Sequence, residues 1–288
     1  MTNKILQDQI IGQKVGALLA EMSLDQKIGQ MTMSERVFLS TEDVYHYHIG
    51  AVLSCGGSSP GDNRPTDWVD MNDAFWAASM TQDESHLAIP VLYGVDAIHG
   101  NNNIRGATIF PHNIGLGAAN DPDLIRRIAQ VTAREVLAAG TEWTFAPNLA
   151  VARNIHWGRT YESYSEYTSI VTAYAAEFVR GLQADLGTNG VLACIKHWVG
   201  DGGTTYGINQ GETTLARDQL DSIHIAPFRN AIKSGALTIM ASFNSWNGDK
   251  CPGHKYLLTE VLKNEMQFQG FVVSDWDGID YLSEDYHN

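Results

Sequence analysis

The segment 270–278 reads GFVVSDWDG, and it contains the pattern that recurs along the whole chain. Four residues suited to a β-strand lead directly into Asp275, which Trp276 follows. A short apolar run bounded by turn residues is typical of a buried strand in a parallel sheet. A carboxylate at the end of such a strand has either a functional role or the structural role of capping the next helix.

Five other apolar runs have the same character, and patterns of helical spacing separate them. Together with 270–273, they predict strands at 51–54, 90–95, 143–146, 191–195 and 237–241. Apolar residues at helical spacing predict an N-terminal amphipathic helix and further helices at 66–83, 122–139, 165–184, 220–234 and 254–268. Ser23 and Gln26 form a capping-box pattern, and Asp121 before Pro122 is a typical helix start. Alternating strands and helices predict a parallel sheet with helical crossovers.

Polar or ionisable side chains follow five consecutive runs of this series. They are Asp96 with His99, the loop 147–166, Lys196 with His197, the segment 242–244, and Asp275. In a (β/α)8 barrel, functional groups gather at the C-terminal ends of the strands, because the loops there share one rim. The alternative of an open nucleotide-binding sheet is disfavoured, because the turn CGGSSPGDN after 51–54 lacks the G-x-G-x-x-G pattern. The sequence therefore predicts an α/β fold, a TIM-type (β/α)8 barrel over residues 1–288, with six strands and so incomplete at its C-terminus.

Five motifs resemble those of the N-terminal barrel domain of the family 3 glycoside hydrolases, the β-glucosidase and exo-glucanase group. In chain order they are YGVDAIHG (93–100), FAPNLAVARNIHWGRTYESYSE (145–166), KHWVGDGG (196–203), MASFNSWNG (240–248) and GFVVSDWDG (270–278). The resemblance covers nearly the whole chain. It implies retaining hydrolysis that releases terminal β-D-glucosyl residues, without a metal or other cofactor.

The resemblance also implies roles for individual residues. Asp275 matches the catalytic nucleophile. The groups that hold the sugar in the reacting subsite match Asp96, Arg159, Lys196 and His197. The aromatic residue that contacts the neighbouring sugar matches Trp276, and Phe243 is a further candidate for substrate binding.

The chemistry of these residues is compatible with such roles, and each also has a structural alternative. Retaining hydrolysis needs two carboxyl groups about 5–5.5 Å apart, and Asp275 has a position fixed by its strand. Lys196 and His197 are adjacent, so they converge on one ligand only where the strand breaks into the glycine-rich loop. Otherwise they are a snorkelling lysine and a core histidine. Arg159 either binds vicinal hydroxyls or forms a loop-holding salt bridge with Glu162.

The second carboxyl group is not marked by any motif. The carboxylates that could approach the site are Glu142, Glu162, Asp201, Glu212, Asp277 and Asp280. In the family's β-glucosidases this acid comes from a separate C-terminal domain, so we expect that domain, absent from these residues, to be the partner that supplies it. The His-Asp pair of some related N-acetylglucosaminidases is not expected, because the loop VGDGGTTYGINQGET contains no histidine. The alternative function is a catalytically incomplete, sugar-binding fragment.

Composition limits the partners. A net charge of −14 disfavours nucleic acid, because phosphate binding needs a clustered positive surface. No apolar stretch approaches the roughly 20 residues of a membrane helix. We expect a β-linked gluco-oligosaccharide or an aryl glucoside as the substrate. The N-terminus lacks the features of an export signal, so we expect either a cytoplasmic protein or a periplasmic or secreted one whose signal was removed, and the sequence does not decide between them.

Cysteine and histidine usage gives little further chemistry. The three cysteines are widely spaced and form no C-x-x-C pair, and Cys194 lies in an apolar run as a core residue. His46 and His48 are two residues apart, which raises a metal-dependent hydrolase as a third interpretation. They precede the first predicted strand, so a structural role is favoured.

Overall fold

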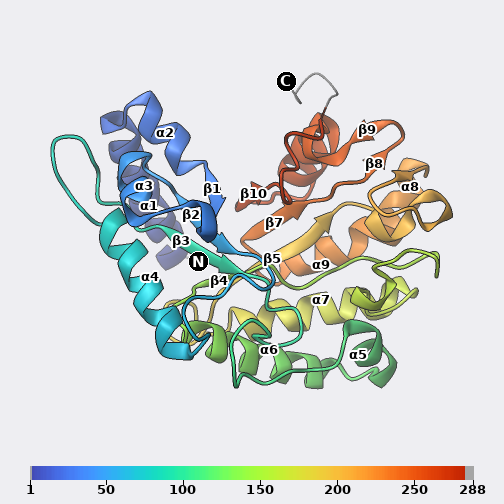
Figure 1. Ribbon diagram of the computed structural model, residues 1–288. Coiled ribbons are helices and arrows are strands. Elements are labelled where there is room, and N and C mark those ends of the chain that lie inside the picture. The colour runs from blue at the N-terminus through green and yellow to red at the C-terminus, as the bar shows by residue number, and fades with distance from the viewer. Residues whose placement is uncertain (1, 283–288) are drawn as a thin grey trace.

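A computed structural model of the protein describes residues 2–282, and its centre is a curled parallel sheet of seven strands. In spatial order the strands are β1 (Met33–Glu35), β2 (Ala51–Ser54), β3 (Leu92–Val95), β4 (Trp143–Thr144), β5 (Leu192–Trp198), β7 (Thr238–Ala241) and β10 (Phe271–Val273). Every neighbouring pair is parallel. The sheet curves into an open half-barrel whose end strands are β1 and β10 (Figure 1). This confirms the TIM-type α/β fold.

The strand prediction needs two corrections. A seventh strand, β1, precedes the six predicted ones, and it was missed because its sequence, MSE, is short and partly polar. Strand β5 continues to Trp198, so Lys196 and His197 lie inside the strand and not in the loop after it. Their convergence therefore needs a distortion of the strand itself.

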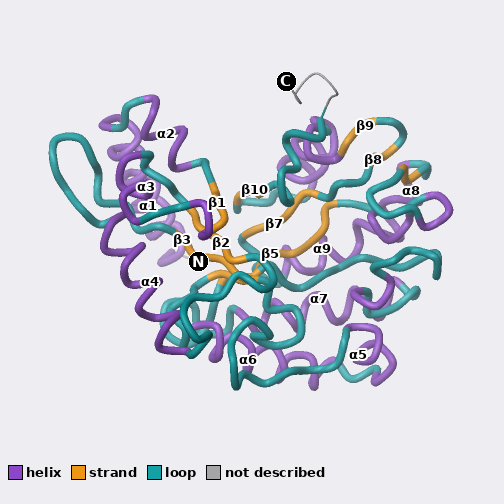
Figure 2. Tube along the Cα trace, viewed as in Figure 1, coloured by secondary structure: helices purple, strands orange, loops and turns teal. Residues whose placement is uncertain are grey.

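The helices are α1 (Thr2–Glu21), α2 (Leu24–Gln30), α3 (Thr41–His46), α4 (Pro65–Ser79), α5 (Asn113–Ala119), α6 (Pro122–Leu137), α7 (Thr168–Leu182), α8 (Arg217–Leu220) and α9 (Ala226–Lys233). Helices α4, α6, α7 and α9 lie on the outer side of the sheet (Figure 2), whereas the described side chains of α1, residues 10–21, are all exposed. The predicted helix 220–234 is interrupted by a π-helical segment, Asp221–Ile225, and the last predicted helix is the π-helical segment Tyr256–Glu265. Within residues 2–282, no helix is both long enough and apolar enough to cross a membrane.

The predicted helix starts are confirmed by side-chain bonds. Ser23 accepts from the backbone N–H of Gln26 at 3.2 Å, and the Gln26 side chain accepts from Ser23 N at 2.9 Å. Asp121 accepts from Leu124 N at 3.0 Å, directly before Pro122. These bonds satisfy N–H groups that the first turn of a helix leaves without partners.

Two apolar clusters lie on opposite faces of the sheet. The larger fills the space between strands and helices. The smaller lines the concave face and consists of Leu53, Trp143, Phe145, Cys194 and Met240. Cys194 is fully buried there, which confirms its role as a core residue. The five side chains of this cluster are buried, so the concave face is packed below the rim.

A small second sheet holds two of the rim loops together. It consists of β6 (Glu212–Thr213), β8 (Ser245–Trp246) and β9 (Asp249–Lys250). The buried Asn244 donates from Nδ2 to the carbonyl of Val199 at 3.2 Å and to Thr213 Oγ1 at 3.1 Å. The loops after β5 and β7 are consequently fixed relative to each other, beside the carboxyl ends of the strands.

Candidate active site

Charged side chains from four elements meet at the C-terminal ends of the strands. Lys196 Nζ, on β5, donates to Oδ1 of Asp96, after β3, at 2.5 Å. His197 Nε2 lies 3.5 Å from Oδ2 of Asp275, after β10, and 3.4 Å from Nη2 of Arg159, in the loop after β4. Five of the seven predicted site residues are thus linked by contacts within one rim.

Lys196 and His197 reach this site from a distorted part of β5. The register of β5 against β7 shifts between Ile195 and Trp198. A local irregularity of this kind redirects side chains that would otherwise alternate across the strand. Both side chains are nearly buried, at 6% and 3% exposure, and both contact charged groups of the site. The expectation that the strand must first become a loop was wrong, since the distortion lies within the strand.

Arg159 is held in a fixed orientation by Glu162. Its Nε and Nη2 atoms each donate to one Glu162 oxygen at 2.7 Å, and Asn148 Nδ2 donates to Oε2 at 3.0 Å. Burial works to lower the pKa of Arg159, but the bonds and charge of Glu162 raise it overall. Burial works to raise the pKa of Glu162, and the Arg159 bonds lower it overall. Arg159 therefore makes the predicted salt bridge and still places Nη2 against His197.

Glu162→Gln should destabilise the fold at neutral pH by about 3 kcal/mol, because it leaves a largely buried guanidinium without its carboxylate. The pKa of Glu162 is lowered in the folded state, so its contribution is fully present above the unfolded value of about 4.3. The difference in the free energy of unfolding between Glu162→Gln and wild type should then shrink as the pH falls below that value. Urea unfolding at neutral and acid pH measures this. Glu166→Gln, at an exposed position nearby, is the matched control, and an equal loss in both variants would contradict the argument.

Asp275 is accessible from the rim and is not a helix cap. Its side chain is 17% exposed, and Oδ1 accepts from the backbone N–H of Trp276 at 2.7 Å. The described residues after it, 276–282, form turns and bends and no helix. The capping alternative is therefore wrong, and the second oxygen, Oδ2, points toward His197.

The aromatic candidates divide into exposed and packed groups. Trp276, beside Asp275, is 44% exposed. Phe243, after β7, is partly buried and packs edge-to-face with Tyr281 at 5.7 Å. Trp157 and Trp198 are fully buried, so they are packing residues. Only the first two lie where an apolar ring face can meet a ligand.

Two carboxylates of the rim were not assigned a role by the motifs. Glu35, which ends β1, accepts from Cys55 N at 2.9 Å and from the Ser58 hydroxyl. The sequence did not suggest Glu35 as a rim residue because it did not reveal strand β1. Asp201 lies 3.0 Å from His197 Nδ1, and the i,i+4 spacing was a signal that could have found it. Burial, followed by the charges of Glu35, Asp96 and Asp275, raises the pKa of the Cys55 thiol to about 11, so the thiol lies in an acidic surrounding.

The other carboxylates that could serve as the general acid either accept hydrogen bonds from donors or lie outside the charged cluster. Glu162 and Asp201 are held by Arg159 and His197, as above. Glu212 Oε1 accepts from Gly248 N at 3.0 Å. Glu142 precedes β4 and so lies at the opposite end of the strands, while Asp277 and Asp280 belong to the exposed turn after Asp275. Within residues 2–282, none of these carboxylates therefore stands out as the partner of Asp275.

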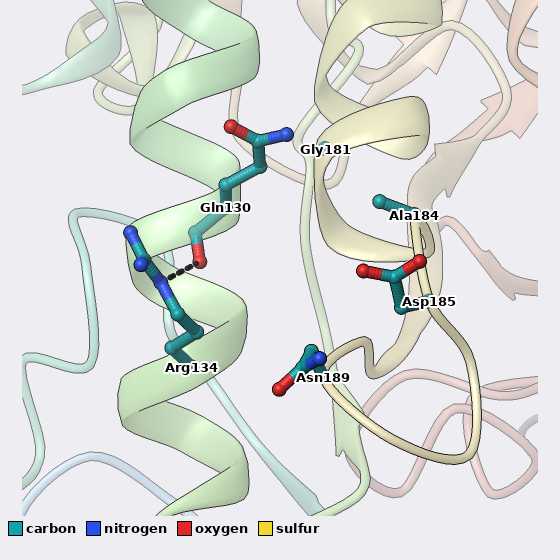
Figure 3. A pocket seen from close by; sticks show the side chains of 6 residues that line it. All are labelled: Gln130, Arg134, Gly181, Ala184, Asp185 and Asn189. Carbon is teal, nitrogen blue, oxygen red and sulfur yellow. Dashed lines mark hydrogen bonds between the residues drawn. The ribbon is translucent and has the colours of Figure 1, made fainter.

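Two other features lie away from the rim. The rings of His48 and His86 are 5.1 Å apart, and His86 stacks on Tyr45. No group of three metal-ligating side chains occurs in the part of the chain that the structure describes. A surface hollow of about 330 Å³ lies between α6 and the C-terminal end of α7 with the loop after it, and it is lined by Gln130, Arg134, Gly181, Ala184, Asp185 and Asn189 (Figure 3). Because Asn189 precedes β5, this hollow is at the end of the barrel away from Asp275.

A curled parallel sheet with its charged side chains on the carboxyl rim defines an α/β-barrel protein of the enzyme type. The chain belongs to glycoside hydrolase family 3, because residues 23–288 match the Glycosyl hydrolase family 3 N terminal domain. The predicted family is thereby confirmed.

Curated relatives and solved structures agree with this assignment. The chain is 30% identical to a lysosomal beta glucosidase of Dictyostelium discoideum, over 95% of this chain and 36% of that protein. It is 28% identical to a periplasmic beta-glucosidase of Salmonella typhimurium, over 92% and 33%. An exo-1,3/1,4-beta-glucanase structure from a Pseudoalteromonas species superposes with a TM-score of 0.89 at 47% identity, over 93% of this chain and 35% of that one. The chain thus spans about one third of the length of these relatives.

Proposed function

We propose that residues 1–288 form the nucleophile-bearing barrel of a retaining β-glucosidase-type glycoside hydrolase, which releases terminal β-D-glucosyl residues from oligosaccharides. The observation that carries this is the placement of Asp275. It ends a barrel strand, keeps one oxygen directed into the charged cluster, and is reachable from the rim. The names of the relatives, beta-glucosidases and an exo-glucanase, support the same substrate class.

In this proposal, each site residue has a role that agrees with its position at the rim. Asp275 attacks the anomeric carbon and forms a glycosyl ester, and water later cleaves this ester with overall retention. Asp96, Arg159, Lys196 and His197 hold the hydroxyl groups of the reacting sugar, because a carboxylate, a planar guanidinium, an ammonium and an imidazole offer complementary donors and acceptors. Trp276 and Phe243 offer ring faces that pack on the C–H faces of a pyranose.

The general acid, in this proposal, comes from outside the described residues. The observation in favour is that the rim carboxylates other than Asp275 already accept bonds from donors, as Asp96, Glu162, Asp201 and Glu35 do. The C-terminal domain of family 3 β-glucosidases is the source that we infer. By itself the 288-residue chain would then bind sugar and form the ester but turn over ordinary glucosides poorly.

This predicts a large dependence on the leaving group. Without proton donation, the glucose unit of cellobiose must leave as an alkoxide, which costs about 10²- to 10⁴-fold in rate. Dinitrophenolate needs little protonation, so 2,4-dinitrophenyl β-glucoside should give a burst of about one equivalent per chain followed by slow turnover. The test compares both substrates on the purified 288-residue chain. Cellobiose turnover at rates usual for glycosidases would show that an acid lies within the chain.

A further inference from the structure

Asp201 lies directly behind His197 and has no role in the proposed chemistry so far. Its Oδ2 is 3.0 Å from His197 Nδ1, and its Oδ1 accepts from the backbone N–H of Gly202 at 3.0 Å. The Asp201 side chain is only 10% exposed. Both oxygens are therefore engaged by neighbours within the protein.

The loop that carries Asp201 is closely packed, so this carboxylate cannot easily turn away. A Cβ on Gly202 would lie 2.5 Å from the carbonyl oxygen of Val151, and one on Gly203 would lie 2.4 Å from His224 Nε2. Arg153 N also donates to the Gly202 carbonyl at 2.8 Å. The glycines thus allow a backbone approach that fixes the position of Asp201.

A carboxylate accepts hydrogen bonds, so Nδ1, which is hydrogen-bonded to Asp201, carries a proton. Nε2 is 3.5 Å from Asp275 Oδ2 without a hydrogen bond to it, and its hydrogen-bond partner is Arg159 Nη2, which can only donate. In histidine, the bond made by one nitrogen determines the state of the other. Nε2 is therefore the nitrogen presented to Asp275 Oδ2 and Arg159 Nη2. The protonation state of the nitrogen that faces the nucleophile is thus set by Asp201, and not by His197 alone.

We propose that Asp201 is a positioning residue, which keeps the His197 proton on Nδ1 and so presents Nε2 to the nucleophile and to the sugar. The relevance to catalysis rests on the proposed function, in which His197 contacts the substrate. The tautomer itself does not depend on that function, so the two ideas can fail separately.

Asp201→Asn provides a sharp test, because an amide has one oxygen where the carboxylate has two. If this oxygen keeps the bond from Gly202 N, the amide nitrogen faces His197 Nδ1, and the ring must accept there. If the oxygen instead keeps the bond from His197 Nδ1, the amide N–H group faces the backbone N–H of Gly202 in a buried place. Moving the ring proton to Nε2 lets Nδ1 accept from the amide and leaves the Nε2 proton facing Asp275 Oδ2, while Arg159 Nη2 keeps its bond to Glu162, so we expect the tautomer to change. The same Asp→Asn change in a Ser-His-Asp triad leaves the geometry intact but gives the wrong tautomer.

The measurement is a long-range ¹H–¹⁵N correlation spectrum of the histidine rings in the ¹⁵N-labelled chain at neutral pH. His197→Gln identifies the His197 signals by their loss. We expect a protonated Nδ1 in wild type, an unprotonated Nδ1 in Asp201→Asn, and no change in Asp218→Asn, an exposed control. An unprotonated Nδ1 in wild type would overturn the proposal without any variant, as would an unchanged ring in Asp201→Asn.

Activity provides the second readout. Asp201→Asn should slow release of dinitrophenol from the activated glucoside by about 10- to 100-fold, the size of effect typical for the partner that orients a metal-bound histidine. A changed tautomer with an unchanged rate would contradict the positioning role. Failure of wild type to release dinitrophenol would instead count against the proposed function and leave the tautomer result standing.

Discussion

Asp275→Ala will lower the rate of the dinitrophenol burst from 2,4-dinitrophenyl β-glucoside by about 10⁴-fold or more, the scale on which enzymes lose activity with their nucleophile. The reason is that, in the proposed mechanism, the ester forms on Asp275. Among the carboxylates of residues 2–282, Asp275 is the one that follows β10, is partly exposed and has an oxygen directed into the charged cluster.

The control for this variant is Asp280→Ala, which removes an exposed carboxylate from the turn that follows. It should leave the burst within about twofold of wild type. Azide gives a further check, because it can enter the space left in Asp275→Ala and attack the anomeric carbon. The product should be the α-glucosyl azide, since a single displacement inverts the centre. A burst that survives in Asp275→Ala would contradict the assignment of the nucleophile.

Lys196→Ala should reduce kcat/KM for the same substrate by about 10²- to 10⁴-fold. The Lys196 ammonium is nearly buried and bonded to Asp96 at 2.5 Å, so its loss leaves that carboxylate without its cation. In the proposed mechanism it also removes a donor to the sugar hydroxyls, and such bonds strengthen in the transition state.

Lys233→Ala, at an exposed position at the end of α9, is the matched control and should behave as wild type. The comparison is made from initial rates at low substrate concentration, with unfolding curves to show that both variants are folded. A Lys196→Ala chain within threefold of wild type would show that the lysine does not bind substrate.

Most of the fold was predictable because its strands are short apolar runs with clear boundaries. The runs at 51–54, 237–241 and 270–273 became β2, β7 and β10 almost residue for residue. Strand β1 was not predictable in the same way, because three residues with one apolar side chain have no period to detect. It is identified as a strand only by its pairing with β2.

The charged residues that meet at the rim were predictable, but the bonds between them were not. Polar residues at strand ends identified Asp96, Lys196, His197 and Asp275, because parallel strands bring their ends to one rim. The bonds between them depend on a shift in the register of β5, which no residue pattern signals. The sequence suggests Asp201 only as a candidate acid, since its contact with His197 depends on how the loop packs.

Covalent labelling tests the central claim most directly, because it identifies the nucleophile by its bond to the sugar. The 288-residue chain is incubated with 2,4-dinitrophenyl 2-deoxy-2-fluoro-β-glucoside, digested, and mapped by mass spectrometry. The account predicts one fluoroglucosyl group per chain, on Asp275 within the segment 270–278, and none on Asp275→Ala. A label on any other carboxylate, such as Glu35 or Glu162, would contradict it, as would release of dinitrophenol without a covalent adduct.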